Sequence, residues 1–172
     1  MIPGKVGEAL HVLFKAVDPL PVRWLIAGSC GLALQGVEVT PHDIDVLTDD
    51  AGSRTIHAAL SEFEKRPLVR KDGERSRPLI GCVEIHEVEI EIMSDLEADV
   101  KSVWVRRQGL KPERVAFFNG MSLPVLPLED ALAAYRAMDR EKDHEKVAKI
   151  EAVLEGRRQE GLLYKGHASR PN

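Results

Sequence analysis

Near the start of the chain, apolar residues recur at helical spacing. A short segment of consecutive apolar residues follows. Residues 4–17 place apolar side chains every three or four positions, which predicts an amphipathic helix. The run over 22–27 predicts a strand, and the turn at Gly28-Ser29 opens a short helix that stops at Gly36. We therefore expect a helix, a strand, a small-residue turn and a second helix, in this order.

In the middle of the chain, several segments have the apolar residues and turn signals that are typical of β-strands. Residues 43–48 predict a strand, which a further helix follows. Residues 79–85 and 88–93 predict a hairpin that turns at His86-Glu87, and a second hairpin is predicted between 114 and 126 around an Asn-Gly turn. Together with the first strand, these segments predict a mixed sheet.

Two segments between these strands show little periodicity. Residues 65–78 are rich in lysine and arginine and contain proline and glycine, which predicts a basic loop. Arg75 and Arg77 in this segment are candidates to bind a triphosphate or an anionic acceptor, and a merely solvated loop is the alternative. Residues 94–111 predict a short helix and a loop.

The C-terminal part of the chain returns to helical spacing. Residues 128–138 predict one helix, and after a charged break a second helix continues the apolar period. The last residues contain few apolar side chains, so we expect them to be frayed. The expected fold is α/β (α+β), a mixed sheet flanked by helices, and it divides into a core over 1–126, a helical segment over 127–160 packed on the core, and a flexible tail over 161–172.

Composition narrows the class of protein. Apolar residues make up 44% of the chain and charged residues 30%, which is typical of a globular domain. The net charge of -4 argues against a protein that binds nucleic acid through bulk electrostatics. Cys30 and Cys82 have neither the spacing of a zinc site nor that of a disulfide framework. With no signal sequence and no apolar run long enough for a membrane span, we expect a cytoplasmic protein.

Two pairs of acidic residues lie on predicted strands. Asp43 and Asp45 are two positions apart, so their carboxylates project from the same face, and Glu89 and Glu91 do the same on another strand. Clustered carboxylates favour magnesium, which binds a few of them together with phosphate oxygens. The Gly28-Ser29 turn before a helix offers backbone N–H groups and a hydroxyl to a phosphate. This pattern indicates phosphoryl transfer, whereas a solvated strand end and a helix N-cap are the structural alternatives.

These motifs resemble the signature of the nucleotidyltransferase superfamily. The Gly-Ser turn is separated by thirteen residues from Asp43-Ile44-Asp45-Val46. Pro41-His42, which precede the aspartates, and the segment over 126–143 are similar to the corresponding parts of minimal bacterial and antibiotic-type nucleotidyltransferases. The likeness covers about residues 22–150 and implies a core like that of DNA polymerase β.

The resemblance also implies roles for single residues. Asp43 and Asp45 would bind two Mg2+ ions, with Glu91 as the third carboxylate and the candidate base, although Glu89 competes for this place. Gly28 and Ser29 would bind the nucleoside triphosphate, and Lys142 would neutralise its charge. Many relatives carry a lysine where this chain has Tyr135, which would stack on the nucleotide or pack in the core.

The function that the resemblance implies is the transfer of a nucleoside monophosphate from a nucleoside triphosphate, such as ATP, to an acceptor hydroxyl. A small molecule or a protein is the expected acceptor, and nucleic acid is not. The alternative is a non-catalytic, antitoxin-like or regulatory binding protein that retains the same fold. The sequence leaves the identity of the acceptor open.

Overall fold

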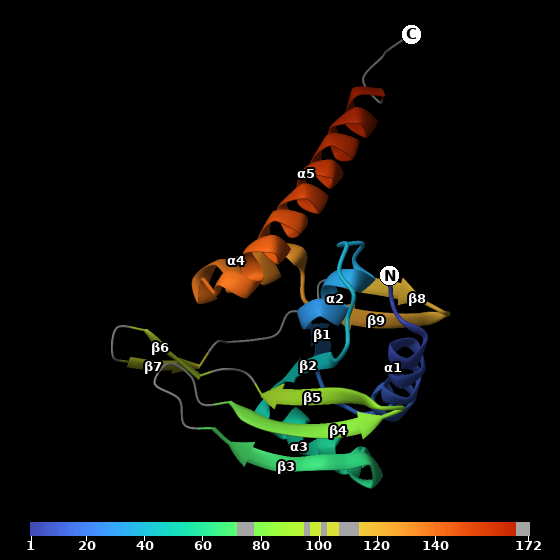
Figure 1. The fold of residues 1–172 in the computed structure, drawn as a ribbon, viewed down its shortest axis with the longest axis vertical. Helices are drawn as coiled ribbons and strands as arrows, with labels where there is room; N and C mark the ends of the chain where they lie inside the picture. Colours follow the sequence, from blue (N-terminus) through green and yellow to red (C-terminus); the bar gives the residue numbers. More distant parts are fainter. Residues whose placement is uncertain (72–77, 95–96, 101–102, 107–113, 168–172) are drawn as a thin grey trace.

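The computed structural model describes residues 1–71, 78–94, 97–100, 103–106 and 114–167. Its centre is a seven-stranded mixed sheet with the strand order β3-β4-β5-β2-β1-β9-β8 (Figure 1). The strands are β1 (Trp24–Ala27), β2 (Ile44–Thr48), β3 (Glu64–Arg70), β4 (Leu79–Ile85), β5 (Val88–Ser94), β8 (Arg114–Phe118) and β9 (Met121–Val125).

The pairing of β2 with its two neighbours sets the geometry of the sheet centre. β2 is antiparallel to β1 and parallel to β5, and its alternating residues fall on opposite faces. Ile44 and Val46 of β2 are fully buried, as is Ile90 of β5. Asp45 and Glu91, on the other face, are only half-buried. The alternation thus buries one face of β2 and β5 in the core and leaves the carboxylates on the other.

Helices supply the cover for the apolar face. α1 (Gly4–Val17) and α3 (Asp50–Ala59) contact each other and pack with the sheet in the larger hydrophobic core. The buried residues of α1 recur every three or four positions, which explains why this segment forms an amphipathic helix. α2 (Gly28–Leu34) follows β1 without a connecting loop. It contributes Cys30 to the larger core and Leu32 to a second one.

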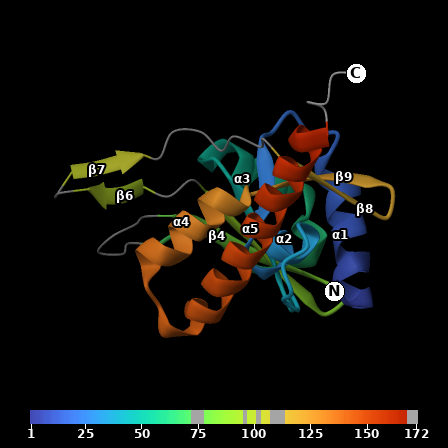
Figure 2. The same cartoon turned by 90° about the horizontal axis from the view of Figure 1, so that it is seen from above.

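The second core joins α4 (Leu128–Met138) and α5 (His144–His167) to α2 (Figures 1 and 2). Arg157 Nη2 on α5 donates a hydrogen bond of 2.6 Å to the carbonyl of Gln35, just after α2. Gln35 Nε2 in turn donates to the carbonyls of Gly31 and Leu126, at 3.0 and 2.8 Å. These bonds tie α5 to the C-terminal end of α2, and they tie the same end of α2 to Leu126, just before α4.

The mixed sheet flanked by helices confirms the expected fold class, but two local predictions were wrong. The expected basic loop contains β3, an edge strand paired with β4. The expected short helix over 94–111 is replaced in the described residues by strands β6 (Glu97–Val100) and β7 (Val103–Arg106), which form a separate hairpin (Figure 2).

The remaining differences concern the ends of segments. α5 runs to His167 and so extends beyond residue 160, where the sequence predicts a tail. Arg75 and Arg77 lie outside the described residues. Among the helices described, none is both long and apolar enough to cross a membrane.

Candidate active site

The turn between β1 and α2 lies directly against Asp45. Ala27, the last residue of β1, pairs with Asp45 of β2, and Gly28 then begins α2 with a φ of +58°. A Cβ atom on Gly28 would come within 1.8 Å of Asp45 Oδ2. Glycine is required here both because this φ is strained for other residues and because the carboxylate fills the space that a side chain needs. The glycine turn and Asp45 therefore form one structural unit.

Asp45 belongs to a row of residues that crosses the sheet. Its partner in the parallel ladder is Glu91 of β5, and Glu91 pairs with Cys82 of β4. Cys82 pairs in turn with Arg66 of the edge strand β3. Because paired residues on neighbouring strands project from the same face, this row places Glu91 between Asp45 and Arg66.

The pKa of Asp45 is shifted by its burial and by these neighbouring charges. Burial raises the pKa of Asp45 from its ordinary value of 3.8 to about 6, and the negative charges of Asp43 and Glu91 contribute to the same shift. The positive charge of Lys146 opposes it. Asp43 lies exposed immediately before β2. The three carboxylates thus influence one another, and they create a site where a cation would be stabilised.

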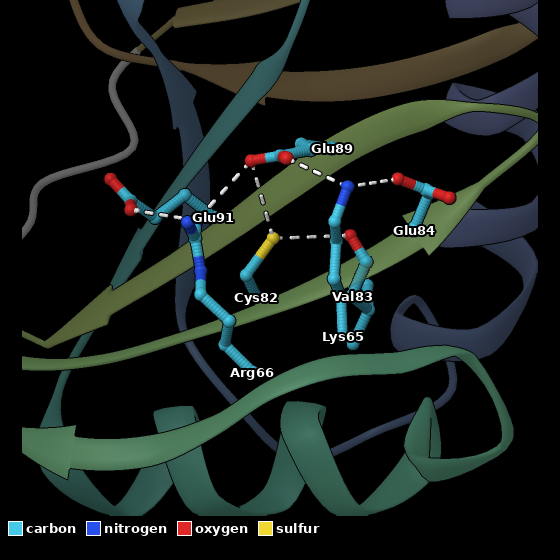
Figure 3. Close-up of polar contacts among 7 residues, drawn as sticks. All are labelled: Lys65, Arg66, Cys82, Val83, Glu84, Glu89 and Glu91. Carbon is cyan, nitrogen blue, oxygen red and sulfur yellow. Dashed lines mark hydrogen bonds and ion pairs between the residues drawn. The ribbon is translucent and has the colours of Figure 1, made fainter.

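The two glutamates of β5 have different surroundings (Figure 3). Glu89 forms ion pairs with Lys65 Nζ at 2.8 Å and Arg66 Nη2 at 3.2 Å. The hydrogen bond from Lys65 is the main reason why the pKa of Glu89 is lowered. Glu91 lies 3.6 Å from the same Arg66 nitrogen and is the residue paired with Asp45. Of the two candidates for the third carboxylate, Glu91 is the neighbour of Asp45, whereas Glu89 is neutralised by basic residues.

The C-terminal helices bring further polar groups toward β2. Burial raises the pKa of Tyr135 on α4 to about 12, and Asp143 and Asp45 add to this shift. Lys146 Nζ on α5 lies 5.4 Å from the centre of the Tyr135 ring and 3.6 Å from Asp143 Oδ1. Asp143 is fully buried and also pairs with Arg140 Nε at 2.5 Å. Tyr135 and Lys146 therefore belong to the electrostatic environment of the carboxylates.

Lys142 and Lys146 are placed differently with respect to the carboxylates. Lys142 lies exposed on the 3-10 turn η2 (Glu141–Asp143), and within the described residues no hydrogen bond or ion pair joins it to Asp43, Asp45 or Glu91. Lys146, which the sequence reasoning missed, is the lysine whose charge acts on Asp45. A signal for it existed, because Lys146 is four residues before the buried Ile150 and so shares the inner face of α5.

The residues of the site suit a hard divalent cation in their chemistry. Asp43, Asp45 and Glu91 offer carboxylate oxygens, which magnesium prefers. The negative charges of Asp43 and Glu91 add to the effect of burial in raising the pKa of Asp45. As the side chains stand, however, no three His, Cys, Asp or Glu residues in the described part of the chain are grouped to hold a metal ion. The side chains of Asp43, Asp45 and Glu91 would have to rearrange to surround a cation.

Replacing Gly28 by alanine should destabilise the protein by about 2 to 4 kcal/mol, because it combines backbone strain with a collision against Asp45. Gly36→Ala is the matched control. Gly36 also has a positive φ, +90°, but no atom lies within 4 Å of the position that a Cβ would take. The Gly36→Ala variant should lose only about 1 kcal/mol of its free energy of unfolding, measured by urea unfolding. Equal losses in the two variants would contradict the close approach of Gly28 and Asp45.

Replacing Asp45 by asparagine should stabilise the protein at pH 7 by about 1 to 3 kcal/mol when a chelator is present. The protonated carboxyl contributes stability that is complete below 3.8 and is lost as the pH rises through about 6, because the folded state binds the proton more tightly than the unfolded state. The gain should therefore shrink toward zero at pH 4 in urea unfolding. A gain of the same size at both pH values would show that ionisation of Asp45 is not its cause.

Comparison with known proteins supports a nucleotidyltransferase fold. A Thermotoga maritima protein assigned as a nucleotidyltransferase is 29% identical in sequence and superposes with a TM-score of 0.77, over 87% of this chain and 94% of that one. The crystal structure of ANT(2'')-Ia in complex with adenylyl-2''-tobramycin is 13% identical, with a TM-score of 0.57 over 95% of this chain and 97% of that one. The solution structure of the antibiotic-resistance factor ANT(2'')-Ia is 14% identical, with a TM-score of 0.55 and coverage of 94% and 96%.

The family assignment comes from the sequence itself. No curated protein sequence matches the chain at a significant level. The family model described as aminoglycoside-2''-adenylyltransferase matches residues 9–150, which is more than half of the chain. The chain is thus a nucleotidyltransferase and belongs to the aminoglycoside-2''-adenylyltransferase family.

Proposed function

We propose that this protein transfers the adenylyl group of ATP to a hydroxyl of a small, positively charged acceptor. The observation that carries the proposal is the position of Asp45, which lies against the Gly28 turn on one side and beside Glu91 on the other. This arrangement offers a phosphate-binding turn and a pair of carboxylates within one site. The adenylylated tobramycin bound to ANT(2'')-Ia supports ATP and an aminoglycoside as the substrate classes.

We further propose that the site works with two magnesium ions. Asp43 and Asp45 would hold both ions and Glu91 would hold one of them. The negative charges of Asp43 and Glu91, which contribute to the raised pKa of Asp45, support this proposal. When bound, magnesium supplies positive charge at the attacking and leaving oxygens of a phosphoryl transfer.

The triphosphate is proposed to lie along the Gly28-Ser29 turn. Backbone N–H groups at the start of α2 and the half-buried Ser29 hydroxyl are suited to phosphate oxygens. Lys146, already near Asp45 and Tyr135, is placed to neutralise part of the triphosphate charge. That Lys142 also neutralises the charge of the triphosphate stays a prediction.

In the proposed reaction the oxygen of the acceptor hydroxyl attacks the α-phosphorus of ATP. A new oxygen–phosphorus bond forms, the bond from the α-phosphorus to the bridging oxygen breaks, and pyrophosphate leaves with the bonding electrons. The proton of the hydroxyl passes to Glu91, which acts as the general base. Asp45 and the glycine turn keep the reacting phosphate in position for this attack.

The charge of the open sheet face favours a cationic acceptor. Glu84, Glu89 and Glu91 project from this face together with Asp45, whereas Lys65 and Arg66 are the basic residues that contact them. Among the described residues, the four carboxylates outnumber Lys65, Arg66 and the nearby Lys146. This excess of negative charge attracts the ammonium groups of an aminoglycoside and repels a nucleic acid backbone. The net charge of -4 for the whole chain acts in the same direction.

Incubation with ATP labelled at the α-phosphate should transfer label to at least one member of an aminoglycoside panel and release pyrophosphate. Uncharged sugars with similar hydroxyl groups should accept no label. Asp43→Asn and Asp45→Asn should each lower pyrophosphate release by about 100-fold or more, because the loss of a reaction-site group costs several kcal/mol in the transition state. Mass spectrometry of the product would locate the added adenylyl group.

Asp18→Asn is the control for this experiment, because Asp18 is an exposed carboxylate at the end of α1. It should keep the rate of the unmodified protein. Pyrophosphate release that is equally fast in the Asp45→Asn variant would contradict the proposed site. Binding of ATP without transfer to any acceptor would instead favour a regulatory binding protein.

A further inference from the structure

Arg66 reaches from the edge strand across β4 to the carboxylates of β5 (Figure 3). Its Nη2 atom lies 3.2 Å from Glu89 Oε2 and 3.6 Å from Glu91 Oε1. The residue between Arg66 and Glu91 in the cross-sheet row is Cys82, a small side chain that is fully buried. Because Cys82 occupies little space above the sheet, the long arginine side chain can pass over β4 and contact β5.

The positions of Arg66 and Asp45 on either side of Glu91 determine toward which neighbour the Glu91 carboxylate is drawn. Glu91 has Arg66 on one side and Asp45 on the other, across adjacent strands. Asp45 repels Glu91, whereas the Arg66 guanidinium attracts it, so the Glu91 carboxylate is favoured on the side of β3. Within the described part of the chain, Arg66 is the ion-pair partner of Glu91. With Glu91 in this contact, the three carboxylates are not grouped into a site for a metal ion in the described part of the chain.

We propose that Arg66 is a positioning residue that holds Glu91 away from the cation site until magnesium arrives with the nucleoside triphosphate. The inference rests on the cation-dependent function proposed above. A cation between Asp43 and Asp45 competes with Arg66 for the Glu91 carboxylate. When Glu91 moves to the cation, Arg66 keeps Glu89 as its partner, so the guanidinium is not left unpaired.

The exposure of the pair sets the size of the effect. The side chains of Arg66 and Glu91 are 56% and 32% exposed. Ion pairs of this exposure are weak, so Arg66 delays completion of the site without blocking it. A cation that also binds the triphosphate gains additional ligands and can overcome the competition. The completed site is therefore coupled to the presence of the nucleotide.

Lys65 offers a matched comparison. It contacts the same network through Glu84 and Glu89, and among the described residues no ion pair joins it to Glu91. Lys65→Met and Arg66→Met each remove one positive charge from the same sheet face and keep an apolar side chain. A general electrostatic effect would be similar in both variants, whereas release of Glu91 would occur only when Arg66 is replaced.

Binding of Mn2+ to the nucleotide-free protein, measured by electron paramagnetic resonance of the free ion, tests the proposal. Arg66→Met should bind Mn2+ about two- to five-fold more tightly than the unmodified protein, which is the fold-change expected for a weak exposed ion pair. Lys65→Met should show a distinctly smaller change. A non-hydrolysable ATP analogue should strengthen Mn2+ binding more in the unmodified protein than in Arg66→Met, because Glu91 is already released in the variant.

Two further results separate the inference from the function on which it rests. Equal changes in Arg66→Met and Lys65→Met, or weaker Mn2+ binding in Arg66→Met, would overturn the role of Arg66 while leaving the proposed function in place. Failure of the unmodified protein to bind Mn2+ with or without the nucleotide analogue would overturn both. Asp45→Asn should abolish the binding and so identify the site, and circular dichroism would verify that each variant is folded.

Discussion

Mutual repulsion among carboxylates on one face of β2 and β5 is the interaction on which the candidate site depends. Asp45 pairs with Ala27 of β1 and Glu91 of β5, and its carboxylate fills the space beside Gly28. Burial is the main cause of the raised pKa of Asp45, and the negative charges of Asp43 and Glu91 add to it. In the function proposed above, a cation neutralises this charge.

The rest of the molecule makes this arrangement possible. The apolar residues that alternate with the carboxylates are buried against α1 and α3, which fixes the strand register. The hydrogen bond from Arg157 to Gln35 ties α5 to the C-terminal end of α2, and the charge of Lys146 on α5 acts on Asp45. Lys65 and Arg66 of β3 pair with Glu89, and Arg66 also contacts Glu91 on the side away from Asp45. The carboxylates thus lie between two groups of basic residues that belong to different parts of the chain.

Local patterns in the sequence are sufficient for the fold class, and they single out the carboxylates of the candidate site. The two-residue period predicts a shared face for Asp43 and Asp45 and another for Glu89 and Glu91, and the β4–β5 hairpin is predicted because its turn separates two clear apolar runs. The pairing of β5 with β2 is what sets Glu91 beside Asp45. β3 was missed because its register with β4 shifts between Glu64 and Arg66 and again between Arg66 and Val69. Such irregularities remove the two-residue period that identifies a strand.

The contacts that depend on distant parts of the chain could not be predicted in this way. Nothing near Arg66 in the sequence indicates that it lies two strands from Glu91, because that relation follows from the order of strands in the sheet. The pairing that sets Glu91 beside Asp45 likewise follows from the strand order, and Glu91 as the third carboxylate stays a prediction. Lys146 is different, since its position relative to Ile150 was readable from helical spacing, and Lys142 was preferred because of its resemblance to a family motif.

The most direct test of the proposed cation site is a crystal structure with Mn2+ and a non-hydrolysable ATP analogue, in which anomalous scattering locates the ions. We expect Mn2+ in contact with Asp43, Asp45 and the triphosphate, with the Glu91 carboxylate turned from Arg66 toward the ion. The triphosphate should lie along the Gly28-Ser29 turn. Manganese bound away from Asp43 and Asp45, or a Glu91 that remains on Arg66 while the site is full, would contradict this expectation.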